Sequence, residues 1–294
     1  MEVRTLKYYL AVAREQNITK AAELLHLTQP TLSRQMMQLE EELDTQLFIR
    51  GKRKIELTDA GMLLKRRAEE IVSLIERTER EFLSEASING QISIGSGEFS
   101  SSNHFTELLK QFQEMYPKVT FDLFSGNTDE IQYKLDNGLI DLAIVMKEAD
   151  INKYDFIRFP EQDIWGVLLR KDDPLAKLDY IEAKDLVNHS LAISRRNSIQ
   201  NEIKNWAGDF YSKYHFVAQF DMMMVNIVKN DIAKAITIHL PMIRPSYEQI
   251  VFRPFKPELT TNSILMWKKN QPLTPTLLKF IEFLKAEYQN KGKK

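Results

Sequence analysis

The chain has 294 residues, with 40 Lys and Arg against 41 Asp and Glu, and it contains no Cys. At about 150 residues per domain, this length predicts two domains. Without cysteine the chain cannot form a disulfide framework, an iron–sulfur cluster, a thiolate zinc site or a cysteine nucleophile, which indicates a reducing compartment. The net charge of −1, taken alone, argues against a nucleic-acid partner, because a basic domain is the usual sign of one.

The N-terminus carries a short apolar patch, residues 8–13, between Lys7 and Arg14. This patch is too short and too closely flanked by charge for a secretory signal. No run of apolar residues approaches the ~18 that a membrane span needs. We therefore expect a cytoplasmic protein with no membrane partner.

Three short helices are predicted at the start of the chain. Apolar residues recur three and four positions apart over residues 3–16, as in an amphipathic helix. Thr19 is expected to cap a second helix that ends near His26, and Thr28 to cap a third with Pro30 in its first turn. A tight turn between the second and third helices predicts a helix-turn-helix.

A wing and a long helix are predicted next. Residues 47–57 resemble two short strands joined at Gly51, the residue best suited to a left-handed turn. Thr58 and Asp59 then begin a helix of about 59–86. Its apolar residues alternate four and three apart, as in a heptad seam, and include Leu64, Ala68, Ile71, Ile75 and Phe82. The helix either packs on its own domain or forms a dimer seam. We favour the seam, because both neighbouring segments look complete without it.

From Gly90 onwards, strand-like runs alternate with amphipathic stretches. The runs lie at 91–96, 119–124, 141–146, 164–169, 190–194, 215–220 and 262–267. The amphipathic stretches include 105–116, 129–137 and 199–213. This alternation predicts an α/β domain with mostly parallel strands.

The third helix has two different faces. Its predicted buried face holds Leu32, Met36, Leu39 and Leu43. The opposite face and its flanks carry no acid, and they present Pro30, Thr31, Ser33, Arg34, Met37 and Gln38. Arg and Gln pair with guanine and adenine edges, and Ser and Thr contact phosphates or bases. The alternative interpretation is a merely solvated face.

Charge is sorted along this region. Acids collect at the far end of the third helix, at Glu40, Glu41, Glu42 and Asp44, whereas the wing carries Arg50, Lys52, Arg53 and Lys54. Residues 1–60 contain nine basic and nine acidic residues, so the segment is neutral overall. Since phosphates repel acids, the first half of the helix is expected to enter the major groove and the wing to contact phosphates or the minor groove.

Two adjacent motifs, ITKAAELLHLTQPTLSRQMMQLEEEL at 18–43 and LFIRGKRKIELTDAG at 47–61, resemble the N-terminal signature of the LysR-type transcriptional regulators. The resemblance continues through nearly the whole chain, with GQISIGS at 90–96, LDNGLIDLAIV at 135–145, RKDDPLAK at 170–177 and LTPTLLKFIEFLKAE at 273–287. The chain is therefore identified as resembling a sequence-specific, DNA-binding regulator of transcription.

The resemblance implies an N-terminal winged helix-turn-helix over 1–58, a linker and dimerisation helix over 59–88, and an effector-binding domain over 89–294. That domain is expected to be α/β, similar to periplasmic solute-binding proteins, with one subdomain at about 90–161 and 267–294 and another at about 162–266. A small-molecule effector between the subdomains would modulate promoter binding.

By position, the resemblance implies base and phosphate contacts from Gln29, Pro30, Thr31, Ser33 and Arg34. It also implies wing contacts from Arg50 and Arg53 and phosphate contacts from Thr19 and Lys20. Gln38 and Lys52 join this set because of their places on the exposed face and in the basic wing.

Effector recognition is predicted where loops leave strands ahead of helices, because helix N-termini favour anions. The candidate residues are Ser100, Ser101, Ser102, Asn127, Thr128, Ser194, Arg196 and Asn197. These groups either bind a small, anionic effector or simply cap helices, and both roles are compatible.

The stretch from Met222 to Lys234 departs from the family pattern, since Lys229–Lys234 replaces a glycine-containing turn. Asn230 and Asp231 tolerate left-handed turns, so the fold is expected to survive. Met222, Met223 and Met224 are read as core, with an apolar part of the effector pocket as the alternative.

The sequence offers little support for an enzyme. The run GSGEFS at 95–100 lacks the third glycine of a dinucleotide fingerprint, and the five histidines have no metal-ligand spacing. We expect no enzyme activity, cofactor or metal. A transport solute-binding protein is disfavoured by the DNA-binding module. The expected partners are a dyad-symmetric double-stranded DNA site, the effector and a second copy in a homodimer or a tetramer of two dimers, with RNA polymerase as a further candidate.

Overall fold

A computed structural model of the chain describes residues 1–51, 54–83, 88–97, 102–146, 152–210, 215–218, 222–239 and 249–291. The chain divides into two compact units, residues 1–85 and 86–294.

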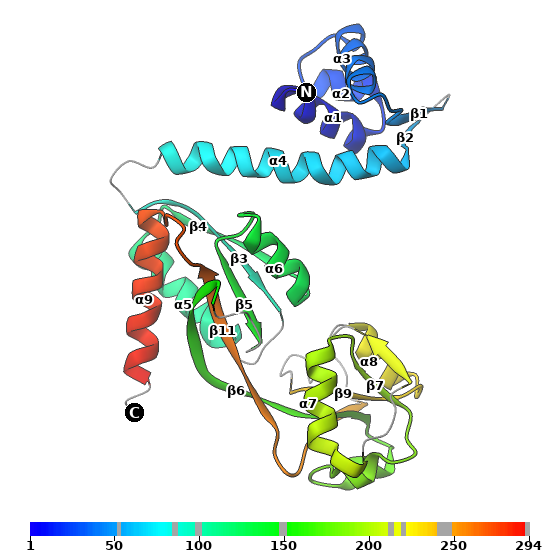
Figure 1. Ribbon diagram of the computed structural model, residues 1–294, viewed down its shortest axis with the longest axis vertical. Helices are drawn as coiled ribbons and strands as arrows, with labels where there is room; N and C mark the ends of the chain where they lie inside the picture. Colours follow the sequence, from blue (N-terminus) through cyan, green and yellow to red (C-terminus); the bar gives the residue numbers. More distant parts are fainter. Residues whose placement is uncertain are drawn as a thin grey trace. The chain divides into compact units, whose positions relative to one another are not determined.

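The N-terminal unit is a winged helix-turn-helix followed by a long helix, blue to cyan in Figure 1. Its helices are α1 (Val3–Glu15), α2 (Ile18–Leu24), α3 (Gln29–Glu42) and α4 (Asp59–Leu83). Its strands β1 (Phe48–Arg50) and β2 (Ile55–Leu57) pair antiparallel. The predicted mainly helical fold with a wing is confirmed.

The core of this unit lies where the four helices meet. Buried apolar residues from all four helices form it together with Leu47, just before β1, and Phe48 in β1. The helical residues are Leu6, Tyr9, Ala11, Val12, Ala21, Ala22, Leu32, Met36, Leu39 and Ala68. Leu43 was expected on the same face, but it follows the last residue of α3 and is 38% exposed. The row of buried residues on α3 therefore ends at Leu39, one turn earlier than the sequence pattern predicts.

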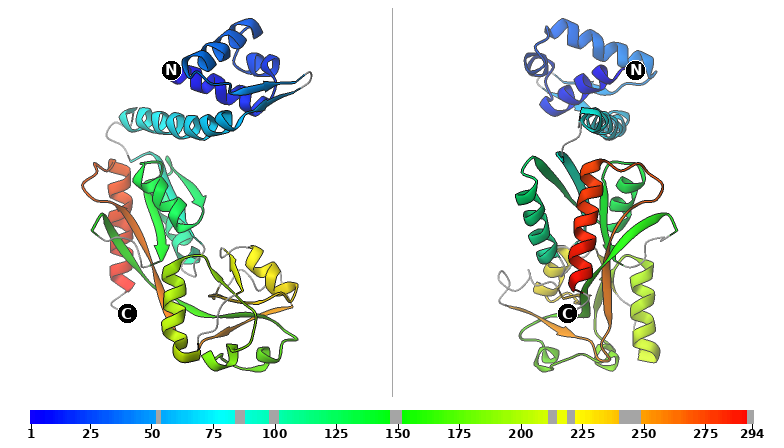
Figure 2. Two further views of the ribbon diagram at one scale, coloured as in Figure 1. Left: turned by 45° about the vertical axis from the view of Figure 1, so that its right-hand side comes forward. Right: turned by 90° about the vertical axis from the view of Figure 1, so that its left-hand side faces the viewer.

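The C-terminal unit contains one mixed sheet with helices on both faces (Figure 2). Its strands are β3 (Gly90–Ser96), β4 (Val119–Ser125), β5 (Leu142–Met146), β6 (Tyr154–Arg170), β7 (Leu191–Ser194), β8 (Phe216–Ala218), β9 (Lys234–Ile238), β10 (Ile250–Pro254) and β11 (Thr260–Lys268). Its α-helices are α5 (Ser102–Met115), α6 (Thr128–Asp136), α7 (Asn197–Ala207), α8 (Met222–Lys229) and α9 (Pro275–Lys291). Three short 3₁₀ helices are η1 (Pro174–Lys177), η2 (Ala183–Leu186) and η3 (Gly208–Phe210).

The strand order is β4-β3-β5-β11-β6-β9-β7-β8, and β10 also pairs with β6. β6 pairs with β11 along one part of its length and with β9 and β10 along another, so this strand joins the two ends of the sheet. Two lobes therefore share one sheet, which confirms the expected two-subdomain α/β architecture.

Each lobe has three layers. In the first lobe, α5 and α9 pack on one face of the sheet, around Phe112 and Phe280. α6 covers the other face, around Ile131. β5 alternates between these two cores, as a strand buried on both faces must. In the second lobe, α7 and α8 contribute to separate cores in the same way.

The sequence pattern predicted mostly parallel strands, and this prediction was wrong. β3 pairs parallel with β4 and β5, and β7 with β8 and β9, but β6 and β11 run antiparallel to their partners. The physical reason is connectivity, because the chain passes between the lobes through two strands of opposite direction.

Candidate nucleic-acid interface and effector domain

The recognition helix α3 begins where the sequence predicts. Thr28 is its N-cap, and the Thr28 hydroxyl accepts a hydrogen bond from the Thr31 amide at 3.4 Å. Pro30 lies in the first turn, where its missing amide donor is tolerated. The Thr28 and Thr31 hydroxyl oxygens are 2.8 Å apart, so this capping group also orients Thr31.

The predicted reading face of α3 is exposed. Gln29, Pro30, Thr31, Arg34, Met37 and Gln38 are all exposed, and Ser33 is half-buried. Leu32, Met36 and Leu39 anchor the opposite face in the core. The donor groups of Arg34 and Gln38 therefore extend from a helix that its own domain holds in place.

Asn17, rather than Thr19, caps α2. The Asn17 side chain accepts a hydrogen bond from the Lys20 amide at 3.1 Å, so the helix begins at Ile18. The predicted cap at Thr19 was wrong, because Asn17 supplies a side-chain acceptor in extended conformation two residues earlier. Thr19 and Lys20 are consequently exposed in the first turn of α2.

The wing hairpin pairs Arg50 with Ile55 across its strands. Gly51 does not adopt the left-handed conformation expected of it. Instead, a Cβ atom at Gly51 would lie 2.8 Å from the Lys54 carbonyl oxygen, so glycine is required by close backbone approach. Lys52 and Arg53, two of the predicted wing contacts, lie outside the described residues.

The acids at the end of α3 have different surroundings. Glu41, Glu42 and Asp44 are exposed, and the carboxylate of Glu42 lies 2.9 Å from the N-terminal ammonium. Glu40 is half-buried, and its Oε1 accepts hydrogen bonds from the amides of Leu47 at 2.7 Å and Phe48 at 3.1 Å. The acidic end therefore includes one residue that binds the backbone leading into the wing.

The heptad residues of α4 separate into two groups. Ala68 is fully buried in the core of the N-terminal unit, and Leu64 packs partly buried against that core. The interpretation of Ala68 as a dimer contact is therefore corrected, because Ala68 has no exposed surface to offer a partner. Ile75 is half-buried, while Ile71 is 37% exposed, and the side chain of Phe82 lies outside the described residues.

Sequence reasoning missed Leu63 and Leu74, two apolar residues of α4 that lie near the predicted seam residue Ile71. Leu63 and Leu74 are 54% and 43% exposed, and their spacing of eleven residues places them on one flank of the helix, near Ile71. We name Leu63, Ile71 and Leu74 the α4 stripe. A helical wheel of α4 places Leu63 and Leu74 on one flank, but the heptad pattern selected Leu64 and Ala68, which pack in or against the core of their own unit.

The predicted effector residues that the structure describes lie at strand ends ahead of helices. Asn127 is the N-cap of α6 and accepts a hydrogen bond from the Glu130 amide at 2.9 Å, and Thr128 is the first residue of that helix. Ser194 ends β7 and is buried, and its hydroxyl accepts a hydrogen bond from the Arg196 amide at 3.3 Å. The capping role is thus observed for Asn127, and Ser194 orients the turn into α7.

The other predicted effector residues are less fully described. Arg196 is the N-cap residue of α7 without a side-chain capping bond, and Asn197 begins the helix. Ser102 begins α5, and its side chain lies outside the described residues, as do Ser100 and Ser101 entirely.

The divergent stretch folds as a helix, a turn and a strand. Asp231 has φ 56°, which confirms that an Asp here accommodates a left-handed turn. Met224 is buried in the core and Met223 is exposed, so the three methionines do not share one environment; the Met222 side chain lies outside the described residues.

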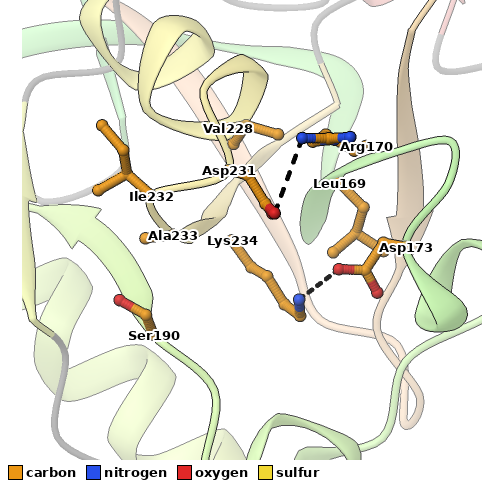
Figure 3. Close-up of a pocket in the computed structure, with 9 residues that line it drawn as sticks. All are labelled: Leu169, Arg170, Asp173, Ser190, Val228, Asp231, Ile232, Ala233 and Lys234. Atoms are coloured by element: carbon orange, nitrogen blue, oxygen red, sulfur yellow. Dashed lines mark hydrogen bonds and ion pairs between the residues drawn. The ribbon is translucent and has the colours of Figure 1, made fainter.

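A pocket of about 90 Å³ lies beside this turn (Figure 3). Lys234 forms an ion pair with Asp173, and both side chains are largely buried. Arg170 lies 3.7 Å from the carboxylate of Asp231. Burial and the nearby Lys234 ammonium lower the pKa of His189. The pocket lies at the start of β9 and before β7, the opposite strand ends from Ser194, so we assign its charges to holding the turn.

Two further observations concern metal binding and membrane spanning. Within the described ranges, no three His, Asp or Glu side chains are grouped as a metal site would require. Among the helices in the described part of the chain, none has both the length and the apolar character to cross a membrane.

The chain matches two family models. Residues 3–62 match the bacterial regulatory helix-turn-helix protein, lysR family, and residues 85–289 match the LysR substrate binding domain. The second match alone covers well over half of the chain. The chain therefore belongs to the LysR family of transcriptional regulators, with a DNA-binding helix-turn-helix and an effector-binding domain.

Relatives and solved structures agree. The Hca operon transcriptional activator HcaR of Escherichia coli (strain K12) is 28% identical over 290 residues, 96% of each chain. A probable RuBisCO transcriptional regulator of Emiliania huxleyi is 31% identical over 232 residues, 76% of this chain and 73% of the relative. The structure of CbnR, a LysR family transcriptional regulator, has a TM-score of 0.74 at 22% identity, covering 98% of this chain and 99% of CbnR.

CbnR has also been solved at full length in complex with its target DNA. That structure again has a TM-score of 0.74 and covers 97% of this chain and 99% of CbnR. At 22% identity this likeness concerns the fold of the chain.

Proposed function

We propose that the first half of α3 reads bases in the major groove of a dyad-symmetric promoter site, while the wing contacts the flanking backbone or minor groove. The supporting observation is the exposed, acid-free surface of α3 around Arg34 and Gln38, held by a buried opposite face. The proposed contacts are Thr19, Lys20, Gln29, Pro30, Thr31, Ser33, Arg34, Gln38, Arg50, Lys52 and Arg53.

The division of labour that we propose follows the expected domains. Residues 1–58 bind DNA, residues 59–88 join two copies, and residues 89–294 bind the effector through subdomains of about 90–161 with 267–294 and about 162–266. The α4 stripe of Leu63, Ile71 and Leu74 supports a dimer contact, because exposed apolar side chains on one helix flank gain from mutual burial. Two such dimers would form the tetramer.

The proposed effector is a small, anionic molecule bound where β3, β4 and β7 end. The N-termini of α6 and α7 support this choice, because their amides and dipoles favour negative charge. Arg196 adds a positive side chain at the start of α7. The effector shifts promoter binding only to the extent that its affinity differs between two arrangements of the subunits.

The remaining elements of this proposal follow from DNA regulation. We propose that the protein acts in the cytoplasm on chromosomal DNA, with RNA polymerase as a further partner. Its role is regulation by binding, without catalysis, since the family to which it belongs consists of transcriptional regulators.

The test is selection of duplex DNA from a random pool by the full-length protein. We expect enrichment of an inverted repeat and protection of both half-sites in a footprint. Anionic metabolites are then screened by thermal shift. At 100 times its dissociation constant, an effector stabilises the protein by about 2.7 kcal/mol, and it should also change DNA affinity. The neutral amide of the same compound is the control.

Two results would contradict the proposal. Recovery of unrelated duplexes would remove sequence-specific binding. A metabolite that stabilises the protein but leaves DNA affinity unchanged would remove the regulatory role of the bound anion.

A further inference from the structure

The carboxylate of Glu40 connects the recognition helix to the wing. Glu40 lies in the last turns of α3, and its Oε1 accepts hydrogen bonds from the amides of Leu47 and Phe48 at 2.7 and 3.1 Å. Phe48 is the first residue of β1, and Arg50 lies two residues further along that strand. A strand advances about 3.3 Å per residue, so the bonded amides of Phe48 and Leu47 lie within ~7 Å and ~10 Å of the position of Arg50 along the chain.

The segment between α3 and β1 is also held by Thr58, the residue that precedes α4. The Thr58 hydroxyl donates a hydrogen bond to the Gln46 carbonyl at 2.7 Å, and the Thr58 amide donates one to the Leu47 carbonyl at 3.0 Å. The rings of Phe48 and Tyr9 pack at 5.3 Å, in the buried core. The chain leaves α3 through Asp44, which adopts φ 45°.

The buried surroundings make the Glu40 bonds strong. Glu40 is half-buried next to Tyr9, whose pKa is raised by burial and by the Glu40 charge. Hydrogen bonds to an ionised carboxylate are about twice as strong as those between neutral groups. If the carboxylate were removed, the amides of two buried residues, Leu47 and Phe48, would lose their acceptor.

We infer that Glu40 is a positioning residue for DNA binding, which fixes the wing relative to the recognition helix so that both reach the duplex together. This inference rests on the proposed function, in which Arg34 and the wing contact the same DNA. Glu40 acts through the backbone of β1 and touches no DNA itself.

At Glu40, removal of a negative charge should weaken DNA binding, the reverse of the usual electrostatic effect. An acid on a DNA-binding helix repels phosphates, so its removal should tighten binding. This applies to Glu41, which is exposed in the same turn of α3. At Glu40 the loss of wing position should outweigh the relief of repulsion. Removal of the carboxylate should therefore weaken DNA binding at Glu40 but not at Glu41.

The experiment compares full-length Glu40→Ala, Glu40→Gln and Glu41→Ala on the duplex that the wild-type protein selects from a random pool. We expect Glu40→Ala to bind about tenfold more weakly, because two charge-assisted hydrogen bonds are lost. Its salt dependence should flatten by roughly 0.9 in log–log slope for each phosphate contact that the wing loses. Base preference at the positions read by α3 should remain.

Glu40→Gln retains an acceptor of the same shape, so its affinity should lie between those of the wild type and Glu40→Ala. This variant also keeps the test valid if Glu40→Ala fails to fold, since a folded Glu40→Gln should still bind more weakly than Glu41→Ala. Glu41→Ala should bind as tightly as the wild type or more tightly.

Two outcomes would overturn the inference. One is a folded Glu40→Ala with the affinity and salt slope of Glu41→Ala. The other is weaker binding by Glu40→Ala with an unchanged salt slope and a lost base preference, which would mean that α3 itself was disturbed. Failure of the wild type to select any duplex would instead contradict the proposed function.

Discussion

At the scale of single residues, we propose that base recognition depends most on Arg34. It is exposed on the face of α3 that carries no acid. We expect Arg34→Ala to weaken binding to the selected duplex by roughly 1–3 kcal/mol and to relax base preference at one position. Fluorescence anisotropy on a panel of single-base variants measures both effects.

Lys7 provides a matched control for this prediction. It lies 3.1 Å from Glu76 of α4, so the same charge is removed away from the reading face. Lys7→Ala should leave base preference unchanged. Equal losses of selectivity in the two variants would contradict the assignment of Arg34.

Asn17 and Thr19 allow stability and DNA contact to be separated within one helix turn. Asn17 caps α2, and Thr19 is exposed in the first turn. Asn17→Ala should lower the free energy of unfolding by about 1 kcal/mol, the usual cost of losing a cap. Thr19→Ala should leave unfolding unchanged and weaken DNA binding. Urea unfolding and anisotropy together test this, and destabilisation by Thr19→Ala would contradict it.

At the scale of elements, α4 has one face that packs in its own unit and one apolar flank that is exposed. Ala68 lies in the core of its own unit, while Leu74 of the α4 stripe is 43% exposed. We expect Leu74→Glu to lower the oligomeric state while the N-terminal unit stays folded, because the charge would enter a partner contact rather than the core. Light scattering measures the assembly.

Ser73 supplies the control for α4, since it is exposed and lies about 100° around the helix from Leu74. Ser73→Glu should leave the oligomer intact. A Leu74→Glu protein that remains a full oligomer would show that copies of the chain meet through another surface.

The sequence predicts elements well where one period dominates. The caps and apolar spacing of α3 define its start at Thr28, and apolar runs define β3, β4 and β5. It predicts poorly where local signals conflict. β9 follows a polar turn, Lys229–Asp231, and was not predicted as a strand. The first half of β6, Tyr154–Glu161, alternates with charged residues, and its role in joining two lobes depends on pairing with β11, about a hundred residues away.

Site residues show the same division. The proposed reading face of α3 follows from a helical wheel, because one helix carries all of its residues. Asn17 was missed as a cap because it follows the apolar pattern of the first helix and was interpreted only as the end of that pattern. The role of Glu40 depends on two backbone amides beyond the end of its own helix, so periodicity offers no sign of it. Contacts that form only because the backbone turns back, such as these, cannot be predicted from helical periodicity.

At the scale of the whole molecule, two-fold symmetry should appear in DNA binding. In the proposed dimer, two recognition helices engage two half-sites, so binding the second half-site is an intramolecular step with a high effective concentration. We expect the wild-type protein to bind the selected inverted repeat at least about a hundredfold more tightly than a duplex in which one half-site is scrambled.

Leu74→Glu should lose this advantage and bind both duplexes with similar, weak affinity, because its two recognition helices are no longer joined. Ser73→Glu should keep the advantage. Anisotropy titrations at one salt concentration compare the three proteins, since phosphate contacts make affinity strongly dependent on salt. A wild-type protein that binds the intact and the scrambled duplexes equally would mean that one half-site is the complete recognition unit, and that the copies joined through α4 do not read the promoter together.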